Sequence, residues 1–355
     1  MSIRERPFLR QVQYVHPDAR DPRTAAVRQQ IRRDFGMLVP PFALHLPVPD
    51  ALSACWAIIR EPTHGRRVGR ATKEAVAAAV STTNSCPYCV EVHTTTLHAL
   101  GDPTSAAAIA AGRPDAIADP DLRAVVAWAR ATRHPDAPIL RQRPFPGEHA
   151  PELIGVALAY HYINRMVNIF AAASPFPVAT PRLKPLMKRI ASPVFRRLLA
   201  REVHPGASLD LLPPAPLPDD LAWAHGDPII AGAYGRAAAA FDAVGREALP
   251  EPVRNLVTAR LTAWRGEEPG LSRGWADYAI QTLPAPQRPQ GRLALLAALA
   301  SYQVDADVLD DARTCPGPAG DETLVATAAW ASFAAARRIG SWLHTAPAAT
   351  PAAKR

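Results

Sequence analysis

The sequence has few cysteines, no long apolar run and almost no alternating β-branched segments. Four cysteines in 355 residues are too few for a disulfide scaffold. No run reaches the roughly 18 apolar residues that a membrane-spanning helix needs, so we expect no integral membrane segment. The polar, arginine-rich first 20 residues contain no apolar core of a signal peptide. These absences predict a cytoplasmic protein.

The charge of the chain is positive, yet it carries no recognisable nucleic-acid-binding pattern. The net charge is +8, and the arginines that dominate it are spread along the whole sequence. No helix-turn-helix signal, zinc-finger spacing or aromatic-plus-basic strand pattern is present. We therefore expect no nucleic-acid partner.

Alanine-rich segments with leucine and valine predict an all-α fold. The 38 prolines lie mainly between these segments, as in connections between helices. The predicted helices of the first half cover residues 25–35, 51–60, 72–82, 86–100, 103–112, 119–132 and 148–172.

The chain divides at a basic, proline-rich linker. We expect a helical domain at residues 1–180, the linker at 181–220, a second helical region at 221–345 and a flexible tail at 346–355. Residues 292–322 have the length and outline of the segment that begins at Glu74: an apolar helix, a short break, a second helix and a closing Gly-Asp. The second region is thus predicted to be a degenerate repeat, since the cysteines and histidine of the first half have no counterpart in it.

Cys86-Pro87-Tyr88-Cys89 is the strongest chemical signal. Proline is favoured at the first position of a helix, which makes Cys86 the N-cap and places Cys89 in the first turn. The free N–H groups and the positive end of the helix dipole are expected to stabilise a thiolate there. Two cysteines at this spacing can also form a disulfide.

His93 and Glu74 complete the candidate site. His93 follows Cys89 by four residues, so both side chains lie on one helix face and the imidazole can carry a proton to or from the sulfur. Glu74 lies on the preceding, otherwise apolar helix. A turn between the two helices would bring this carboxylate against the cysteine–histidine face, which would give a buried charge the partner that it needs.

The string from Glu74 to His93, E-x11-C-x2-C-x3-H, is similar to the signature of the alkylhydroperoxidase D-like and carboxymuconolactone decarboxylase-like family. Ser81 and Asn84 before the first cysteine and the segment YHYINRMVN at residues 160–168 also fit. The resemblance implies an all-helical thiol peroxidase without a bound cofactor or metal. It implies that Cys89 attacks a hydroperoxide, Cys86 resolves the sulfenic acid, and Glu74 and His93 relay protons.

The resemblance also implies the partners of the protein. A hydroperoxide is the substrate, and a lipoyl or thioredoxin-like dithiol protein returns the cysteines to the thiol form. Members of the family form oligomers, so a homo-oligomer is expected.

Two other functions stay open at this point. Cys86, Cys89, His93 and Glu74 could hold a metal ion or act as a redox sensor in a non-catalytic interaction protein, although the spacing differs from common zinc sites. The decarboxylase branch of the family offers a lyase instead, but its members lack the cysteine pair.

The remaining candidate residues have structural interpretations. Cys55 and Cys315 are expected to be buried as small apolar residues. His161 could approach the site, but a core or hydrogen-bonding role is favoured. Arg165 is expected to anchor helices through a carboxylate. The basic stretch 186–202 could lie on an anionic membrane, but packing against the domain is favoured. His64, His98, His134 and His204 are expected to be structural or solvated.

Overall fold

The prediction of an all-α protein is confirmed by a computed structural model of the chain, which describes residues 12–16, 21–175, 203–315 and 320–344. Within these ranges the regular structure is helical, apart from one isolated β-bridge between Val12 and Ala171. No helix in the described ranges is long and apolar enough to cross a bilayer. The basic stretch 186–202 and the tail 346–355 lie outside the described residues.

The seven predicted helices of the first half begin and end within a few residues of their predicted bounds, whereas the short helices α3 and α9 were not predicted. Proline occupies the first turn of α4, α6, α7, α8 and α10, where its fixed φ fits the helix and its missing N–H costs no hydrogen bond. The helices are α2 (Thr24–Phe35), α3 (Pro40–Ala43), α4 (Pro49–His64), α5 (Arg70–Thr83), α6 (Pro87–Ala99), α7 (Pro103–Ala110), α8 (Pro120–Ala131), α9 (Pro138–Arg141) and α10 (Ala150–Phe170).

The second half is also helical, as predicted for residues 221–345. Residues 212–218 between two short 3-10 helices have no regular structure, and their backbone lies against α12: a Cβ on Gly235 would come within 2.9 Å of the Ala215 carbonyl oxygen. The helices are α12 (Pro228–Ala248), α13 (Glu251–Ala263), α14 (Gly274–Ala279), α15 (Arg288–Leu299), α16 (Ala306–Arg313) and α17 (Asp321–Leu343).

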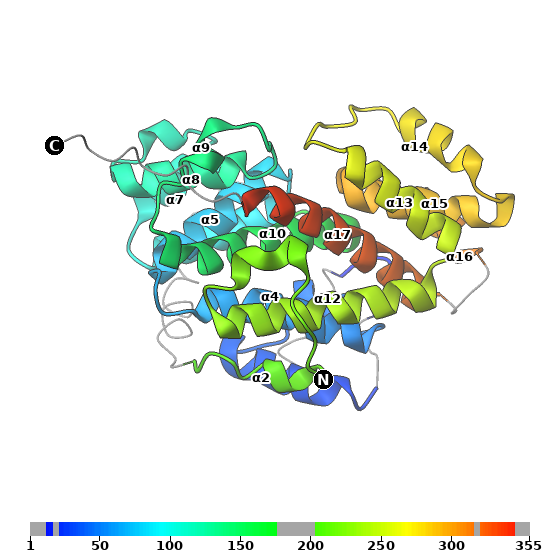
Figure 1. Cartoon of the computed structure of the whole chain (residues 1–355), viewed down its shortest axis with the longest axis horizontal. Coiled ribbons are helices and arrows are strands. Elements are labelled where there is room, and N and C mark those ends of the chain that lie inside the picture. Colours follow the sequence, from blue (N-terminus) through cyan, green and yellow to red (C-terminus); the bar gives the residue numbers. More distant parts are fainter. Residues whose placement is uncertain (1–11, 17–20, 176–202, 316–319, 345–355) are drawn as a thin grey trace.

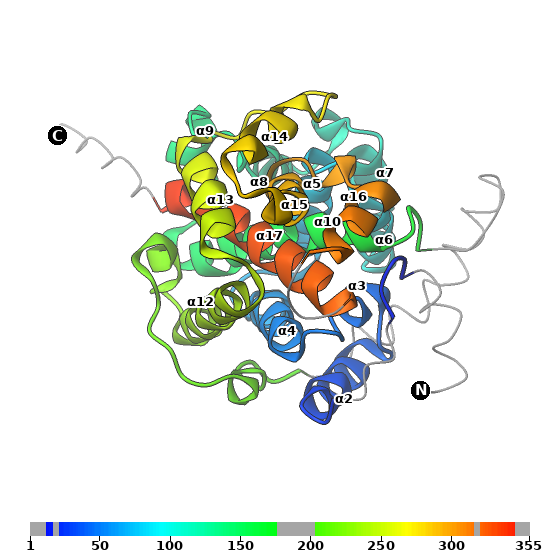
Figure 2. The ribbon, with the colours of Figure 1, turned by 90° about the vertical axis from the view of Figure 1, so that its right-hand side faces the viewer.

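Two long helices, α10 and α17, run through the middle of the molecule and pack against each other (Figure 1). They approach closely, because a Cβ on Gly340 of α17 would lie 2.6 Å from a methyl carbon of Leu158 in α10. Figure 2 shows α4 and α12 on one side of this pair and α13 and α15 on the other. Nearly every residue of α10 is buried, so this helix can present side chains to both halves of the chain.

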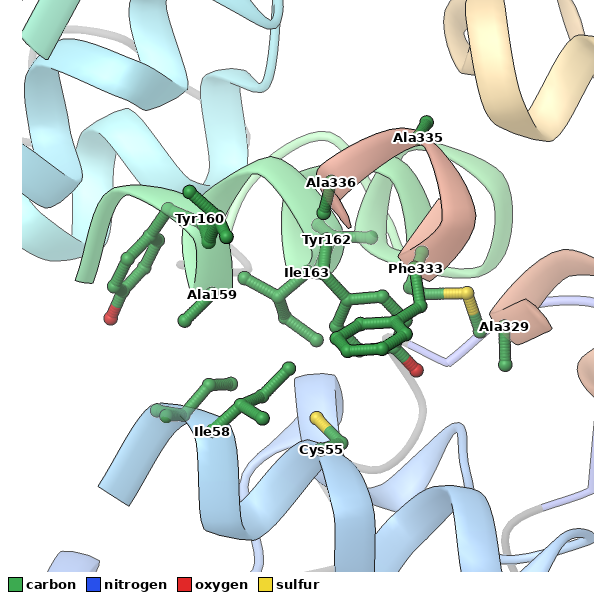
Figure 3. Packing of buried hydrophobic residues seen from close by; sticks show 14 of the residues in the cluster. Cys55, Ile58, Ala159, Tyr160, Tyr162, Ile163, Ala329, Phe333, Ala335 and Ala336 are labelled. Atoms are coloured by element: carbon green, nitrogen blue, oxygen red, sulfur yellow. The ribbon is translucent and has the colours of Figure 1, made fainter. Parts of the chain in front are cut away.

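An aromatic cluster joins the two halves, and Figure 3 shows two of its members, Tyr162 of α10 and Phe333 of α17. Tyr162 of α10 lies 5.0 Å from Phe241 of α12 between ring centroids, and Phe241 stacks on Phe333 of α17 at 4.4 Å. Tyr160, two residues before Tyr162, points to another side of α10 because successive helical residues are rotated by about 100°. The single helix α10 therefore places Tyr162 in the core between the two halves and Tyr160 toward the candidate site.

The two halves share an arrangement of neighbours. In the first half α10 packs against α4 and α5, and α5 packs against α6. In the second half α17 packs against α12 and α15, and α15 packs against α16. The contacts α4–α12 and α10–α17 connect the two sets. This parallel is what a degenerate repeat would produce, and the repeat stays a prediction.

A buried ion pair holds the start of α5 against α10. Lys73 Nζ lies 2.5 Å from a carboxylate oxygen of Glu152, with both side chains 1% exposed. Glu152 also accepts hydrogen bonds from the backbone N–H groups of Arg67 and Val68 at 2.8 and 3.0 Å. The carboxylate thus has several donors, as a buried charge requires, and it fixes the loop from which α5 starts.

Candidate active site

The turn between α5 and α6 places the cysteines. Ser85 takes a left-handed conformation with φ of 51°, which is uncommon for a residue other than glycine. The Cys86 N–H donates to the Ser81 carbonyl at 3.0 Å and closes the end of α5. The chain reverses direction within a few residues, so α6 returns along α5.

Cys86 is the N-cap of α6 and Cys89 lies in its first turn, as predicted. The Cys86 side chain makes no capping hydrogen bond. Both cysteines are free thiols, 1% and 3% exposed. Cys86 lies near enough to Cys89 to raise the pKa of its thiol. A disulfide between them would bring the two sulfurs to about 2 Å.

Glu74 faces His93, as the helix-turn-helix argument predicted. Its Oε2 lies 2.7 Å from His93 Nδ1, and the two side chains are 4% and 13% exposed. The second carboxylate oxygen accepts a hydrogen bond from Arg70 Nε at 2.7 Å. Burial disfavours the charged form of Glu74, but Arg70 and His93 outweigh it and lower its pKa to about 2. The carboxylate is therefore ionised and fixes the orientation of the imidazole.

The expected thiolate stabilisation is wrong for Cys89 as it stands in this structure. Burial raises the pKa of the Cys89 thiol well above its usual value, and the hydrogen bond and charge of Cys86 raise it further. Asn164 acts in the opposite direction through a hydrogen bond to Cys89. The position of a helix dipole can be predicted from sequence, but loss of solvent around the sulfur depends on tertiary packing.

Three residues that contact the site were not predicted. Arg70 precedes Glu74 by four residues on α5, and this spacing alone could have indicated the pair. Tyr160 lies edge-on to the His93 ring with centroids 4.5 Å apart, and Asn164 contacts Cys89 from one turn further along α10. Burial, followed by the negative charge of Glu74, raises the pKa of Tyr160, so its hydroxyl stays neutral.

The other singled-out residues are structural. His161 is fully buried and hydrogen-bonded, and Cys55 is fully buried, as expected. Cys315 is only partly buried, contrary to the prediction. The prediction for Arg165 is wrong in its partner: its guanidinium anchors α10 to α15 by donating to the carbonyls of His161 and Ala298, and burial lowers its pKa to about 9.

A pocket of about 400 Å³ lies away from these residues, lined by Pro135, Leu140, Arg141, Arg265, Arg338, Ser341 and Trp342. None of the four predicted site residues lines it. In the part of the chain that the structure describes, no group of three or more His, Cys, Asp and Glu side chains is arranged to hold a metal ion.

A buried dithiol at a helix start beside a carboxylate–histidine pair is the site of an all-α thiol-dependent protein. Residues 49–131 match the carboxymuconolactone decarboxylase family. Over 339 residues the chain is 39% identical to an alkyl hydroperoxide reductase of Mycobacterium tuberculosis, covering 96% of each chain. The protein belongs to this alkylhydroperoxidase D-like family of the carboxymuconolactone decarboxylase type. No solved structure matches the chain.

Proposed function

We propose that the protein is a thiol-dependent peroxidase that reduces alkyl hydroperoxides with the Cys86–Cys89 dithiol. The observation that carries the proposal is the contact between the two free thiols at the start of α6, beside the Glu74–His93 pair. The near full-length similarity to an alkyl hydroperoxide reductase supports the same reaction.

The proposed cycle starts at Cys89. Its thiolate attacks the outer oxygen of the hydroperoxide, an S–O bond forms, the O–O bond breaks, and the alcohol leaves after taking a proton. Cys89 is then a sulfenic acid. The Cys86 sulfur attacks it, the disulfide forms and water leaves. The peroxide gains the two electrons that the dithiol loses.

Glu74 and His93 are proposed to move the protons of this cycle. His93 follows Cys89 by one helical turn and is held by an ionised carboxylate, so it can accept the thiol proton and deliver it to the leaving alkoxide. Because burial raises the pKa of Cys89, too little of the thiol ionises unaided. A neighbouring base that accepts its proton is therefore needed to form the attacking thiolate.

We further propose a lipoyl or thioredoxin-like dithiol protein as the reductant and the cytoplasm as the location. A disulfide of this kind is reduced by thiol exchange, in which a donor dithiol becomes a disulfide. A reducing compartment supplies such donors. Cell fractionation and a donor screen with lipoylated and thioredoxin-like proteins test these two points.

The second half is proposed to be a degenerate repeat that takes the place of one subunit contact in a homo-oligomer. The matching helix arrangement and the α4–α12 and α10–α17 contacts support this reading. Light scattering of the purified protein gives the oligomeric state.

The decisive experiment measures hydroperoxide consumption with a dithiol donor. We expect turnover and a Cys86–Cys89 disulfide in the mass spectrum of the oxidised protein. Cys89→Ser should abolish consumption, while the matched control Cys315→Ser should retain it. Stoichiometric zinc with unreactive thiols would contradict the proposal in favour of a metal-binding protein. Activity that survives loss of both cysteines would favour a lyase.

A further inference from the structure

A buried chain of polar side chains from α5, α10 and the end of α8 leads to Cys89. Ser81 and Asn84 at the end of α5, Thr132 after α8, and His161 and Asn164 of α10 form it. All five are at most 8% exposed. Buried polar groups are costly unless they are hydrogen-bonded, so the arrangement of this chain is tightly constrained.

The donor and acceptor in each hydrogen bond can be assigned by starting from Thr132, at the end of the chain away from Cys89. The Thr132 hydroxyl donates to the Ala129 carbonyl at 2.7 Å, so its oxygen accepts from His161 Nε2 at 2.8 Å. Burial, and then the charge of Arg165, lower the pKa of His161 well below its usual value, so the imidazole is neutral. With its proton on Nε2, His161 Nδ1 is an acceptor.

The assignment of donors and acceptors can be continued from His161 to Cys89. Asn84 Nδ2 lies 3.1 Å from His161 Nδ1 and 3.0 Å from Asn164 Oδ1. Asn84 Oδ1 lies 3.2 Å from the same His161 nitrogen, but an unprotonated Nδ1 cannot donate to it, so Nδ2 donates to both partners. Asn164 accepts through Oδ1, which turns Nδ2 toward Ser81 Oγ at 3.0 Å and toward the Cys89 thiol. The Ser81 hydroxyl is itself committed as a donor to the Ala77 carbonyl at 2.7 Å. Ser81 Oγ takes one N–H of the Asn164 amide, which leaves the other N–H to act on the Cys89 sulfur.

We infer that Asn164 is the positioning residue that makes Cys89 the attacking sulfur, by holding an oriented amide N–H against its thiolate through the Thr132–His161–Asn84 chain. This rests on the proposed function, which gives Cys89 that task. A hydrogen bond from a donor to a charged group stabilises the charged form. The Cys86 side chain, one turn away, has no capping hydrogen bond. The sequence alone could not distinguish the two sulfurs, because both lie at the same helix end.

The other titratable groups around Cys89 do not distinguish its sulfur from that of Cys86. Cys86 and Tyr88 lie on the same helix, Glu74 faces it from α5 and Tyr160 from α10. Glu74 is ionised, and burial keeps both tyrosines neutral. His93 is retained in every variant of the test, so its effect on the pKa of Cys89 cancels when the variants are compared.

The test follows thiolate formation rather than peroxidase activity. In a Cys86→Ser background, the pH dependence of thiolate ultraviolet absorbance, minus that of Cys86→Ser/Cys89→Ser, gives the pKa of Cys89. We expect Asn164→Ala to raise this pKa by about one unit, which is about tenfold less thiolate at a pH below it. Isosteric Asn164→Asp should raise it more, because a carboxylate would face the sulfur. Thr132→Val should raise it by less than Asn164→Ala.

The control is Asn168→Ala, one turn further on α10. Asn168 donates to the Asn84 carbonyl at 3.1 Å and to Ser301 Oγ at 3.3 Å, not to the sulfur, so its loss should leave the pKa unchanged. Equal pKa values for the parent and both Asn164 variants would overturn the inference, as would an equal shift in Asn168→Ala. If Asn164→Ala fails to fold, Asn164→Asp and Thr132→Val decide the question.

Two separate measurements, the pKa of Cys89 and the consumption of hydroperoxide, test the role of Asn164 and the peroxidase activity independently. If the pKa moves as expected but the unmodified protein consumes no hydroperoxide, the amide chain stands and the peroxidase proposal fails. If the protein consumes hydroperoxide through Cys89 but the pKa does not move, the peroxidase proposal stands and Asn164 is only structural.

Discussion

The turn between α5 and α6 and the turn between α15 and α16 join similar helix pairs, yet only the first carries chemistry. The N-cap of α6 is Cys86, which makes no capping hydrogen bond, whereas the N-cap of α16 is Asp305, which accepts from the Val308 N–H at 3.2 Å. Counted from the N-cap, the positions of Cys89 and His93 are occupied in α16 by the buried Val308 and Ala312.

The polar links between the helices differ in the same way. Glu74 and His93 join α5 to α6 inside the molecule, with the carboxylate 4% exposed. Arg292 joins α15 to α16 at the surface, where it lies 3.3 Å from Asp311 and is 30% exposed. The first turn thus has no side-chain cap on α6 and holds a buried carboxylate. The second turn has a capped helix and an exposed ion pair, and it carries no reactive group.

The largest contrast is in turnover. Cys86→Ala should abolish sustained hydroperoxide consumption, because the Cys89 sulfenic acid then has no resolving thiol. One equivalent of peroxide per chain should still be consumed, and mass spectrometry should find the extra oxygen on Cys89. The same change at Cys315 should leave the assay unaffected. Sustained turnover by Cys86→Ala without a Cys89 sulfenic acid would contradict the cycle.

Glu74→Gln should lower kcat/KM for the hydroperoxide by about 100-fold, at the lower end of what general acid–base groups contribute. The amide keeps the size of the carboxylate but removes the charge that orients His93. Steady-state kinetics at neutral pH measure the effect. Undiminished activity would remove Glu74 from the proton relay.

Glu74 should also give the first turn a stability that depends on pH more strongly than that of the second turn, where Arg273 lowers the pKa of the half-exposed Asp305. A pKa lowered from 4.5 to about 2 corresponds to about 3 kcal/mol, at about 1.4 kcal/mol per pKa unit. Because the folded pKa is the lower one, this stability is present above about pH 4.5 and is lost as the pH falls toward 2. Urea unfolding of the parent and of Glu74→Gln should give a difference that shrinks over this range.

Asp305→Ala should lower the free energy of unfolding by about 1 kcal/mol through loss of the cap of α16, with no effect on turnover. Asp305 also pairs with Arg273, so Asp305→Asn serves as the matched control that keeps a capping oxygen but removes the charge. Thermal unfolding should show a smaller loss for asparagine than for alanine. Reduced peroxidase activity in either variant would show that the second turn takes part in the reaction.

The smallest effect is expected at Arg292. Because this ion pair is exposed, Arg292→Gln should change the free energy of unfolding by less than about 1 kcal/mol, and less still in high salt. Denaturant titrations at low and high ionic strength measure it. A loss as large as that of Glu74→Gln would show that the two links are equivalent after all.

Much of the first half could be predicted from local sequence. Proline at helix starts and the apolar periodicity gave the helix bounds within a few residues, and the spacing of Glu74, Cys89 and His93 placed them on facing sides of two adjacent helices. Arg70 was within reach of the same reasoning, because residues four apart on a helix are neighbours.

The contacts of Asn164 and His161 with Asn84 were beyond that reasoning. Both residues follow Asn84 by about 80 residues, and no local spacing relates α10 to the end of α5. The carbonyl partners of Arg165 were unpredictable for the same reason, since one of them lies in α15. Such contacts arise only when helices from different parts of the chain pack together.

The sequence by itself determined the helices, the cysteine pair at the start of one of them and the acid and histidine within reach, because these depend on residues close together in the chain. Tertiary structure decided how far the Cys89 sulfur is removed from water and which amide reaches it. Both depend on α10 covering the turn between α5 and α6, and the free energy of a charge in that position is set by all the groups around it.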